Sequence, residues 1–289
     1  MINNKYTRWS PSNIDLSEVY VGLPYEVLRE LSICEEHSEL EETNAWCAKI
    51  KENKVDSSYG FLIVDGDSYP DLPNKTRKTL YKTLIRCFGT PVLHQSSHLK
   101  QDIICDIRDS GFRFEGNKDQ TFYISNQEAV EHTDASELID PVKYFSLSVI
   151  YPAFKGGATR LVSAYSLYEA LNIRCKRYLP ILEKEYVFDT GRGEMNKAPI
   201  LFRDADGSIG FRWMRAFLEN GKVHTDHWDD QTDVVLDAVT QIMEEIRIGI
   251  HLKRGDIGIF NNRALLHARD SFQDHPQYPS RWYLRSWFN

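Results

Sequence analysis

The chain has 289 residues, of which 42% are hydrophobic, 12% aromatic and 27% charged, a composition typical of globular proteins. These fractions exclude disorder, collagen-like repeats and low-complexity sequence as descriptions of the whole chain. The 35 Lys and Arg residues against 42 Asp and Glu residues give a formal net charge of −7. Because an acidic surface repels phosphate backbones, we expect no nucleic-acid partner.

The apolar segments predict neither a membrane span nor a secretory leader. No apolar run approaches the roughly 20 residues that cross a bilayer, and the first residues, MINNKYTRWSPSNIDL, lack the apolar core of a signal peptide. We therefore expect a cytoplasmic protein with no membrane partner. The five cysteines are odd in number and contain no C-x-x-C pair, so we interpret them as ordinary thiols: Cys34, Cys47, Cys87, Cys105 and Cys175.

The first part of the chain is predicted to be mostly helical. Apolar residues at three- and four-residue spacing predict helices over 24–40, 41–54 and 75–88, with Gly89 ending the last of these. Between the second and third helices, the run GFLIVDG (60–66) is typical of a buried strand.

After residue 91 the pattern changes to short strand-like runs. These are PVLH, QDIICDI, TFYIS, YFSLSVIYP and ATRLVS, followed by predicted helices over 166–172 and 175–184 and by the strand candidates EYVFD, PILFRD and SIGFRWM. An amphipathic helix is predicted over 231–248, and strands over 256–260, 264–267 and 281–288 close the chain.

No repeat, linker or break in composition divides the sequence. We therefore predict a single domain, 1–289, that is mainly β with flanking helices (α+β), with a sandwich or barrel as its core. A helical part at about 1–90 would pack on that core, and about 164–250 would form a helical or lid-like insertion.

The strongest local motif is His132-Thr133-Asp134, at the end of a strand-like run. In a strand, residues i and i+2 point to the same face, so His132 and Asp134 would enter one cavity. An imidazole and a carboxylate are two adjacent ligands for a divalent transition metal. A third ligand, a histidine from a distant strand, would complete the facial triad of non-haem Fe(II) oxygenases.

The surrounding motifs occur in a recognisable order. The segment PVKYFSLSVIYPAFKGGATRLVS (141–163) is followed by GDIGIFNNRALLHARDSF (255–272) and then by RWYLRSWF. With the H-T-D motif, from about Gly60 to Phe288, they resemble the Fe(II)/2-oxoglutarate-dependent oxygenases of the taurine dioxygenase and clavaminate synthase-like family, in its amino-acid hydroxylase branch. The resemblance implies a double-stranded β-helix (jelly-roll) core.

The resemblance also assigns residues to the metal and the co-substrate. It implies that His132, Asp134 and His267 bind Fe(II), with His267 standing 133 residues after Asp134. Thr159 and Arg281 would hold 2-oxoglutarate, and the guanidinium fork of Arg281 suits its distal carboxylate. 2-Oxoglutarate and O2 are then the implied co-substrates, with succinate and CO2 released. Since related halogenases lack the Asp134 carboxylate, its presence favours hydroxylation.

Three further residues are substrate-binding candidates. Arg285, four residues after Arg281 and on the same face of a strand, would meet the substrate carboxylate, and Gln101 would contact its α-amino group. Arg212 lies in SIGFRWMRAF (208–217), where relatives that bind arginine carry acidic residues. The arginines at 208–217 argue against an arginine substrate and favour a neutral or anionic side chain. The acidic residues at 226–230 would instead suit a cationic substrate, so both alternatives stand.

A second H-T-D, His224-Thr225-Asp226, precedes His267 by too few residues and lacks the following motifs. We interpret it as a loop before a helix, with Asp229, Asp230 or Thr232 as its N-cap.

The predicted function is hydroxylation of an unactivated C–H bond of a small, free amino acid such as lysine or arginine. Desaturation or cyclisation of a small metabolite by the same oxidising chemistry is an alternative, and a non-catalytic jelly-roll binding protein is another. A zinc hydrolase could use the same three ligands but would leave Arg281 and Thr159 without a role. A homo-oligomer remains open.

Overall fold

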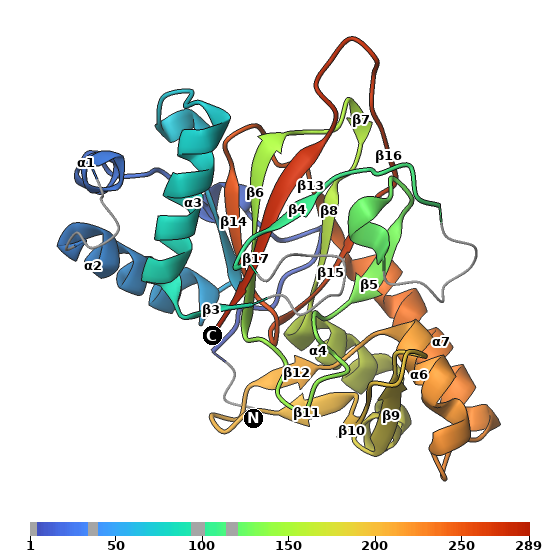
Figure 1. Ribbon diagram of the computed structural model, residues 1–289. Coiled ribbons are helices and arrows are strands. Elements are labelled where there is room, and N and C mark those ends of the chain that lie inside the picture. The colour runs from blue at the N-terminus through green and yellow to red at the C-terminus, as the bar shows by residue number, and fades with distance from the viewer. Residues whose placement is uncertain (1–4, 34–39, 94–101, 114–120) are drawn as a thin grey trace.

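Two β-sheets face each other in the computed structural model, which describes residues 5–33, 40–93, 102–113 and 121–289 (Figure 1). The larger sheet contains, in spatial order, β1 (Tyr20–Val21), β2 (Phe61–Val64), β14 (Ile257–Asn261), β6 (Tyr144–Tyr151), β17 (Trp282–Phe288) and β3 (Pro91–Val92), and β4 (Cys105–Ile107) also pairs with β17. The smaller sheet contains β13 (Ile248–Ile250), β8 (Thr159–Ser163), β15 (Leu265–Arg269) and β5 (Ala129–His132). The prediction of a mainly β protein with flanking helices is confirmed.

The space between the sheets is filled by side chains from both. On β6, Phe145, Leu147 and Val149 point inward at the spacing of two that a strand imposes, and they pack with Leu161 of β8 and Leu265 of β15. The alternate residues of β6 are also buried, because helices cover the outer face of the larger sheet. This double burial explains why the sequence of β6 is apolar almost throughout.

Three helices cover that outer face, as Figure 1 shows on the side of α3 (Asn74–Phe88). Leu80, Leu84 and Ile85 of α3 pack against the sheet, and Tyr81 donates a hydrogen bond to Ser146 O of β6 at 3.1 Å. Gly89 ends α3. A Cβ at this position would lie 2.5 Å from Asn289 O, so the C-terminal end of α3 lies very close to the residue that follows β17. The helices are α1 (Tyr25–Ile33), α2 (Glu41–Ile50), which continues into a π-helical turn at Lys51–Val55, and α3 (Asn74–Phe88).

The outer face of the smaller sheet is covered by the segment between β8 and β13. Val162 and Leu266 of the sheet pack there among buried residues of α4 and α7. The N-terminus of α7 has a capping box in which the Asp229 side chain accepts from Thr232 N, which confirms the predicted cap. The elements are α4 (Ala164–Arg174), α5 (Leu179–Leu182), β9 (Glu185–Asp189), β10 (Met195–Pro199), β11 (Leu201–Arg203), β12 (Ile209–Phe211), α6 (Arg215–Gly221) and α7 (Asp230–Ile246).

Several sequence predictions differ from the structure in this region and before it. TFYIS was predicted as a strand but is a 3-10 helix, and its carbonyls at Phe122 and Ser125 accept hydrogen bonds from the Arg269 guanidinium instead of from a neighbouring strand. β10, α6 and β13 were not predicted. The remaining short elements are β7 (Lys155–Gly156), β16 (Phe272–Gln273) and the 3-10 helices Leu16–Glu18, Gly66–Ser68, Thr121–Ile124, Lys176–Tyr178 and Lys222–His224.

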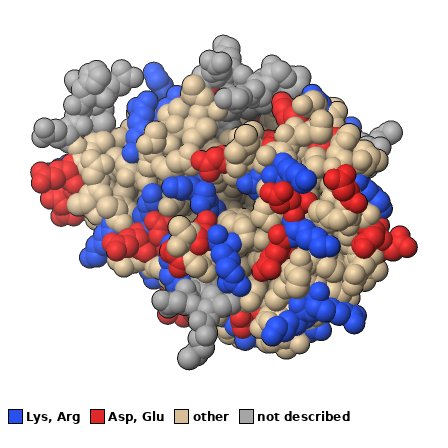
Figure 2. Space-filling model, turned by 90° about the horizontal axis from the view of Figure 1, so that it is seen from below, with Lys and Arg blue, Asp and Glu red and all other residues tan. Residues whose placement is uncertain are grey.

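The charged side chains and the cysteines are distributed as the sequence predicts. On the face seen from below, Lys and Arg side chains are interspersed with Asp and Glu side chains (Figure 2). Cys47, Cys87, Cys105 and Cys175 are free thiols, and Cys34 lies outside the described residues. None of the described helices combines the length and the apolarity needed to cross a membrane.

Candidate metal centre and co-substrate pocket

The end of β5 brings the two residues of the H-T-D motif to one side of the chain. His132 is the last residue of β5 and Asp134 follows two residues later, with 4.0 Å between His132 Nε2 and Asp134 Oδ1. The intervening Thr133 is held on the other side by Trp213, whose carbonyl accepts from Thr133 N at 2.8 Å and whose N–H donates to Thr133 Oγ1 at 3.0 Å.

His267 reaches the same point from β15. It is the register partner of His132 in the antiparallel pairing of β15 with β5, and the two ring centroids are 4.2 Å apart. Its Nε2 lies 3.8 Å from Asp134 Oδ2. One ligand atom from each of the three residues can be chosen so that all lie within 4.8 Å of one another, and the sheet register thus unites residues distant in sequence.

Each of the two imidazoles is held in place by its surroundings. His132 Nδ1–H donates to Val130 O at 2.7 Å, and its Nε2 lies on the side of Asp134. His267 stacks on Phe145 at 4.0 Å between ring centroids. Burial is the largest cause that lowers the pKa of His267 to about 3, so its ring is neutral at physiological pH.

Asp134 is buried but is surrounded by donors and positive charge. Trp287 Nε1–H donates to its Oδ2 at 2.9 Å, and Arg285 Nη1 lies 3.7 Å from its Oδ1. Burial by itself would raise the pKa of Asp134, yet His267, Arg285 and His132 together with Trp287 lower it. Since His267 is neutral, we attribute the ionised state of Asp134 chiefly to Arg285 and Trp287.

Asn262 holds the main chain of Asp134 on both sides. Its Oδ1 accepts from Asp134 N at 2.8 Å, and its Nδ2 donates to Asp134 O at 2.9 Å and to Val142 O at 2.9 Å. The sequence analysis quoted Asn262 within its N-N-R motif but assigned it no role, and it did not consider Trp287. Two features of the sequence could have pointed to these roles: the second asparagine of the N-N-R motif, and the aromatic residue two positions after Arg285.

Arg281 enters the space between the sheets from the residue preceding β17. It is only 2% exposed, and its Nε and Nη1 have no hydrogen-bond partner among the described residues. Its guanidinium lies 3.8 Å from the ring centroid of Tyr283, and burial lowers its pKa. A buried guanidinium with unpaired donors is costly by itself and fits an anionic ligand bound in the same space.

Thr159 and the two glycines before it form the neighbouring wall. Thr159 of β8 is buried and pairs in register with Arg269, two residues after His267, so it lies on the same face as His267. Gly157 has φ +72°, and a Cβ there would lie 3.2 Å from Phe272 Cβ and 3.7 Å from Arg281 Nε. The G-G-x-T sequence therefore allows the backbone to approach Arg281 closely.

Arg285 follows Arg281 on the inward-facing side of β17. Its guanidinium lies 4.7 Å from the Trp287 ring centroid, and its Nε is buried without a hydrogen-bond partner among the described residues. Arg285 thus lies beside Asp134 and retains a free donor, as a substrate-binding residue would require.

The other sequence candidates lie elsewhere. The Arg212 guanidinium contacts main-chain carbonyls after the H-T-D motif and does not reach the three metal-ligand candidates in any described hydrogen bond. Gln101 lies outside the described residues. His224 of the second H-T-D ends a short 3-10 helix, and Thr225 Oγ1 accepts from Val187 N, so this motif is structural as predicted.

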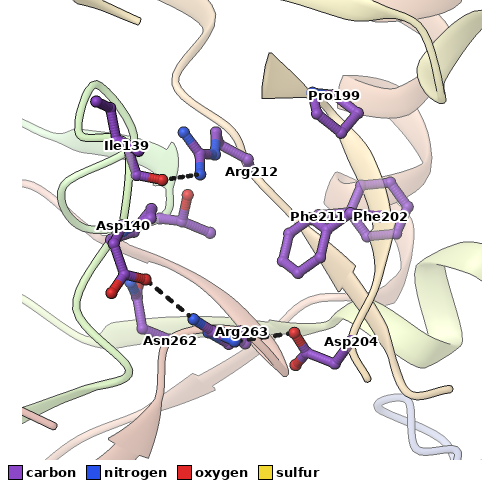
Figure 3. A pocket seen from close by; sticks show the side chains of 11 residues that line it. Ile139, Asp140, Pro199, Phe202, Asp204, Phe211, Arg212, Asn262 and Arg263 are labelled. Atoms are coloured by element: carbon purple, nitrogen blue, oxygen red, sulfur yellow. Dashed lines mark hydrogen bonds and ion pairs between the residues drawn. The ribbon is translucent and has the colours of Figure 1, made fainter. Parts of the chain in front are cut away.

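A separate cavity of about 250 Å³ adjoins the back of the H-T-D segment (Figure 3). Phe202 and Phe211 face it from β11 and β12, and Arg263 crosses it to pair with Asp140 and Asp204. Thr133 and Asn262 line it, whereas His132 and His267 do not. The cavity therefore touches the supports of the metal-ligand candidates and not the ligands themselves.

Two known proteins are similar to part of this chain in sequence. A uridine-5'-phosphate dioxygenase of Streptomyces sp is 28% identical over 190 residues, which is 59% of this chain and 65% of that protein. A taurine hydroxylase-like protein of Stachybotrys chartarum is 27% identical over 148 residues, 49% of this chain and 37% of that protein. The chain thus spans less than two thirds of the length of either relative.

Solved structures with the same fold are more distant in sequence. An asparagine oxygenase in complex with Fe(II), 2S,3S-3-hydroxyasparagine and succinate is 13% identical over 93% of each chain, with a TM-score of 0.67. A variant of the non-heme iron oxygenase OrfP in complex with (3S)-hydroxy-L-Arg is 15% identical over 93% of each chain, with a TM-score of 0.69.

The model of one protein family matches residues 52–287, most of the chain. This match confirms the family that the sequence motifs predicted. The chain belongs to the taurine catabolism dioxygenase TauD, TfdA family.

Proposed function

We propose that this protein is an Fe(II)- and 2-oxoglutarate-dependent dioxygenase that hydroxylates an unactivated C–H bond of a small amino acid. One observation carries the proposal: His132, Asp134 and His267 converge on one point between the sheets. The same space contains the buried guanidinium of Arg281, whose Nε and Nη1 find no hydrogen-bond partner in the described part of the chain. A metal site alone would not require that guanidinium.

The donor set fits Fe(II). His132 and His267 would each contribute Nε2, and Asp134 would contribute one carboxylate oxygen. Two neutral imidazoles and one carboxylate are the ligand set of non-haem Fe(II) oxygenases, which leaves positions for co-substrates. When bound, the iron would supply the O2 chemistry, in which 2-oxoglutarate is converted to succinate and CO2 and the substrate is oxidised.

The protein's own contribution is placement and exclusion of water. Trp287 and Arg285 keep Asp134 ionised, and the hydrogen bond from His132 Nδ1 to Val130 O orients that ring. Arg281 would pair through two parallel N–H donors with the distal carboxylate of 2-oxoglutarate, with Thr159 beside it. Buried aromatic residues such as Phe145 limit access of water to the site.

Arg285 supports an anionic group on the substrate. We assign it to the carboxylate of a free amino acid, and we retain Gln101 as the partner of the α-amino group. The asparagine oxygenase and OrfP structures contain hydroxylated amino acids, which supports this substrate class. Lysine, arginine or a similar amino acid is the proposed substrate.

A second candidate is favoured by the Streptomyces relative, whose name describes a uridine-5'-phosphate dioxygenase. A phosphate also suits a guanidinium fork, so Arg285 would then hold the phosphate of a nucleotide. In this case, the nucleoside portion would be oxidised.

The decisive experiment measures succinate release with Fe(II), 2-oxoglutarate and O2 in the presence of each standard amino acid or of uridine-5'-phosphate. We expect one or a few amino acids to stimulate succinate release and to gain one oxygen by mass spectrometry. Stimulation by the nucleotide alone would favour the second candidate, and loss of two hydrogens would identify desaturation or cyclisation.

The metal ligands provide the control for that screen. His267→Ala should abolish succinate release, whereas His224→Ala, in the second H-T-D, should leave it unchanged. Binding of an amino acid without any succinate formation in the wild-type protein would instead support the non-catalytic binding protein.

A further inference from the structure

The backbone immediately after Asp134 is held by side chains from the segment between β8 and β13. Arg212 Nη1 donates to Leu138 O at 2.8 Å and to Ser136 O at 3.3 Å, and its Nη2 donates to Ile139 O at 3.3 Å. Asn196 Nδ2 of β10 donates to the same Leu138 O at 3.1 Å. Figure 3 shows the Arg212 guanidinium directed at the Ile139 carbonyl.

The residue after Arg212 holds the other side of the metal motif. Trp213 exchanges main-chain and side-chain hydrogen bonds with Thr133, and Met214 forms an isolated bridge with His132. Three consecutive residues, 212–214, therefore contact the chain both before and after Asp134. This arrangement constrains the direction in which the Asp134 carboxylate leaves the backbone.

The backbone between these contacts is strained. Ala135, directly after Asp134, has φ +57°, in the left-handed region that residues with a Cβ seldom adopt. Such a conformation persists only where surrounding contacts impose it. Leu138 N donates to Ala135 O at 3.0 Å, which closes the turn whose other carbonyls Arg212 and Asn196 bind.

The chemistry of arginine suits this position. A planar guanidinium presents several N–H donors at fixed angles and can contact three carbonyl oxygens at once, which the single ammonium of a lysine does less well. The three carbonyls belong to successive parts of one turn, so their common donor fixes the shape of the turn.

We propose that Arg212 is a positioning residue, which fixes the metal-binding geometry of Asp134 by holding the carbonyls of residues 136–139. This inference rests on the metal site of the proposed function, and it replaces substrate contact as the role of Arg212. The substrate would meet Arg285 instead.

Metal affinity tests the proposal without any turnover. The full chain is titrated with Co(II), and binding is followed by visible absorption, which also reports the coordination geometry. Arg212→Gln should weaken Co(II) binding about 10-fold, within the range for groups that orient metal ligands. Arg212→Lys should recover only part of this loss. Arg215→Gln is the matched control, because Arg215 pairs with Glu219 and Asp237 away from the metal motif.

Asn196→Ala provides a milder variant in case Arg212→Gln does not fold. It removes one of the donors to Leu138 O and should weaken Co(II) binding in the same direction by a smaller factor. Unchanged Co(II) affinity in a folded Arg212→Gln protein, or in Asn196→Ala if that is the only folded variant, would overturn the proposal. Equal weakening in Arg215→Gln would overturn it as well.

The same variants separate this inference from the proposed function. If a substrate is found, Arg212→Gln should lower kcat and leave the KM of that substrate nearly unchanged. A raised KM with unchanged Co(II) affinity would instead show that Arg212 contacts the substrate, and it would overturn the inference. If the wild-type protein oxidises no tested substrate but its Co(II) affinity depends on Arg212, the inference stands and the proposed substrate class fails.

Discussion

Trp287 determines how one oxygen of the Asp134 carboxylate is held, because its indole N–H donates to Oδ2 at 2.9 Å within a buried site. A hydrogen bond to a charged group contributes about 1.5–3 kcal/mol. The remaining oxygen, Oδ1, faces both His132 and Arg285. The indole therefore helps to select which carboxylate oxygen is available to a metal.

Replacing this indole tests its role. Trp287→Phe keeps an aromatic ring but removes the donor, so we expect Co(II) affinity to fall about 10-fold. Trp282→Phe is the control on the same strand, since Trp282 Nε1 donates to Asp106 at an exposed site. Equal Co(II) affinities of the two variants, measured by titration, would contradict the assigned role of Trp287.

Arg281 is the second residue whose role can be isolated. Arg281→Lys should raise the KM for 2-oxoglutarate at least about 10-fold, because a lysine replaces a two-donor fork with a single charge. The measurement compares 2-oxoglutarate with 2-oxobutyrate, which lacks the distal carboxylate. The ratio of kcat/KM for 2-oxoglutarate to that for 2-oxobutyrate should be smaller in the variant than in the wild type. An unchanged ratio would show that Arg281 does not bind the distal carboxylate.

Residue patterns predicted the metal-ligand candidates better than they predicted the residues that hold those candidates in place. His132 and Asp134 could be paired by strand periodicity, and resemblance to a family supplied His267, whose neighbour in space is set by the register of β15 on β5. No local pattern predicts that Arg212 contacts the carbonyls of Ser136, Leu138 and Ile139, which lie 73 to 76 residues earlier in the chain. That contact depends on where the chain returns after β12, which is a tertiary property.

At the scale of elements, the tight turn carrying β7 depends on glycine. Gly156 has φ +74°, and a Cβ there would lie 2.4 Å from Ser271 O, where β7 pairs with β16. The turn places Gly157 against Phe272 and near Arg281, so the geometry of the co-substrate pocket depends on this backbone approach.

A methyl group at this glycine should disrupt the turn. Gly156→Ala should lower the free energy of unfolding by about 1–3 kcal/mol, because the backbone must shift and a strained φ is retained. Chemical denaturation measures the change, with Gly249→Ala as the control, where the nearest atom to an added Cβ is 3.8 Å away. Comparable losses in both variants would show that steric contact at Gly156 is not the cause.

Elements with strong hydrophobic periodicity were predicted well, and exposed or irregular ones were not. The runs over β6, α3 and α7 bury a continuous face or both faces, so their sequences carry a clear pattern. β10 has only one fully buried residue and, among the described strands, pairs with β9 alone, so burial imposes little apolar alternation on it. The TFYIS segment has strand-forming residues, but its carbonyls are used by the Arg269 side chain.

At the scale of the whole molecule, the metal site joins elements that are remote in sequence. Its candidates come from the end of β5 and from β15, and Arg285 and Trp287 come from β17 in the opposite sheet. A metal bound there would contact only the folded arrangement, because the unfolded chain separates these groups. Metal binding should therefore be linked to global stability.

Thermal unfolding measures that linkage. Co(II) or Fe(II) at about 100 times its Kd should add about 2.7 kcal/mol of stability and raise Tm, and a chelator should reverse the change. His267→Ala should show little increase in Tm under the same conditions. An equal increase in the wild type and in this variant would assign the stabilising metal to another site.

Arg281, immediately before β17, and Arg285, within β17, lie on the same side of one extended segment. Arg285 stands four positions after Arg281, which corresponds to about 13 Å along an extended backbone. The distance between the backbone positions of the two arginines is consequently set by peptide geometry, and it would also set the span between two anions held by their guanidinium groups. Inserting or deleting one residue between the arginines would turn one of them to the opposite face of the sheet. New substrate preferences in homologues of this chain should therefore arise from changes in the surrounding loops.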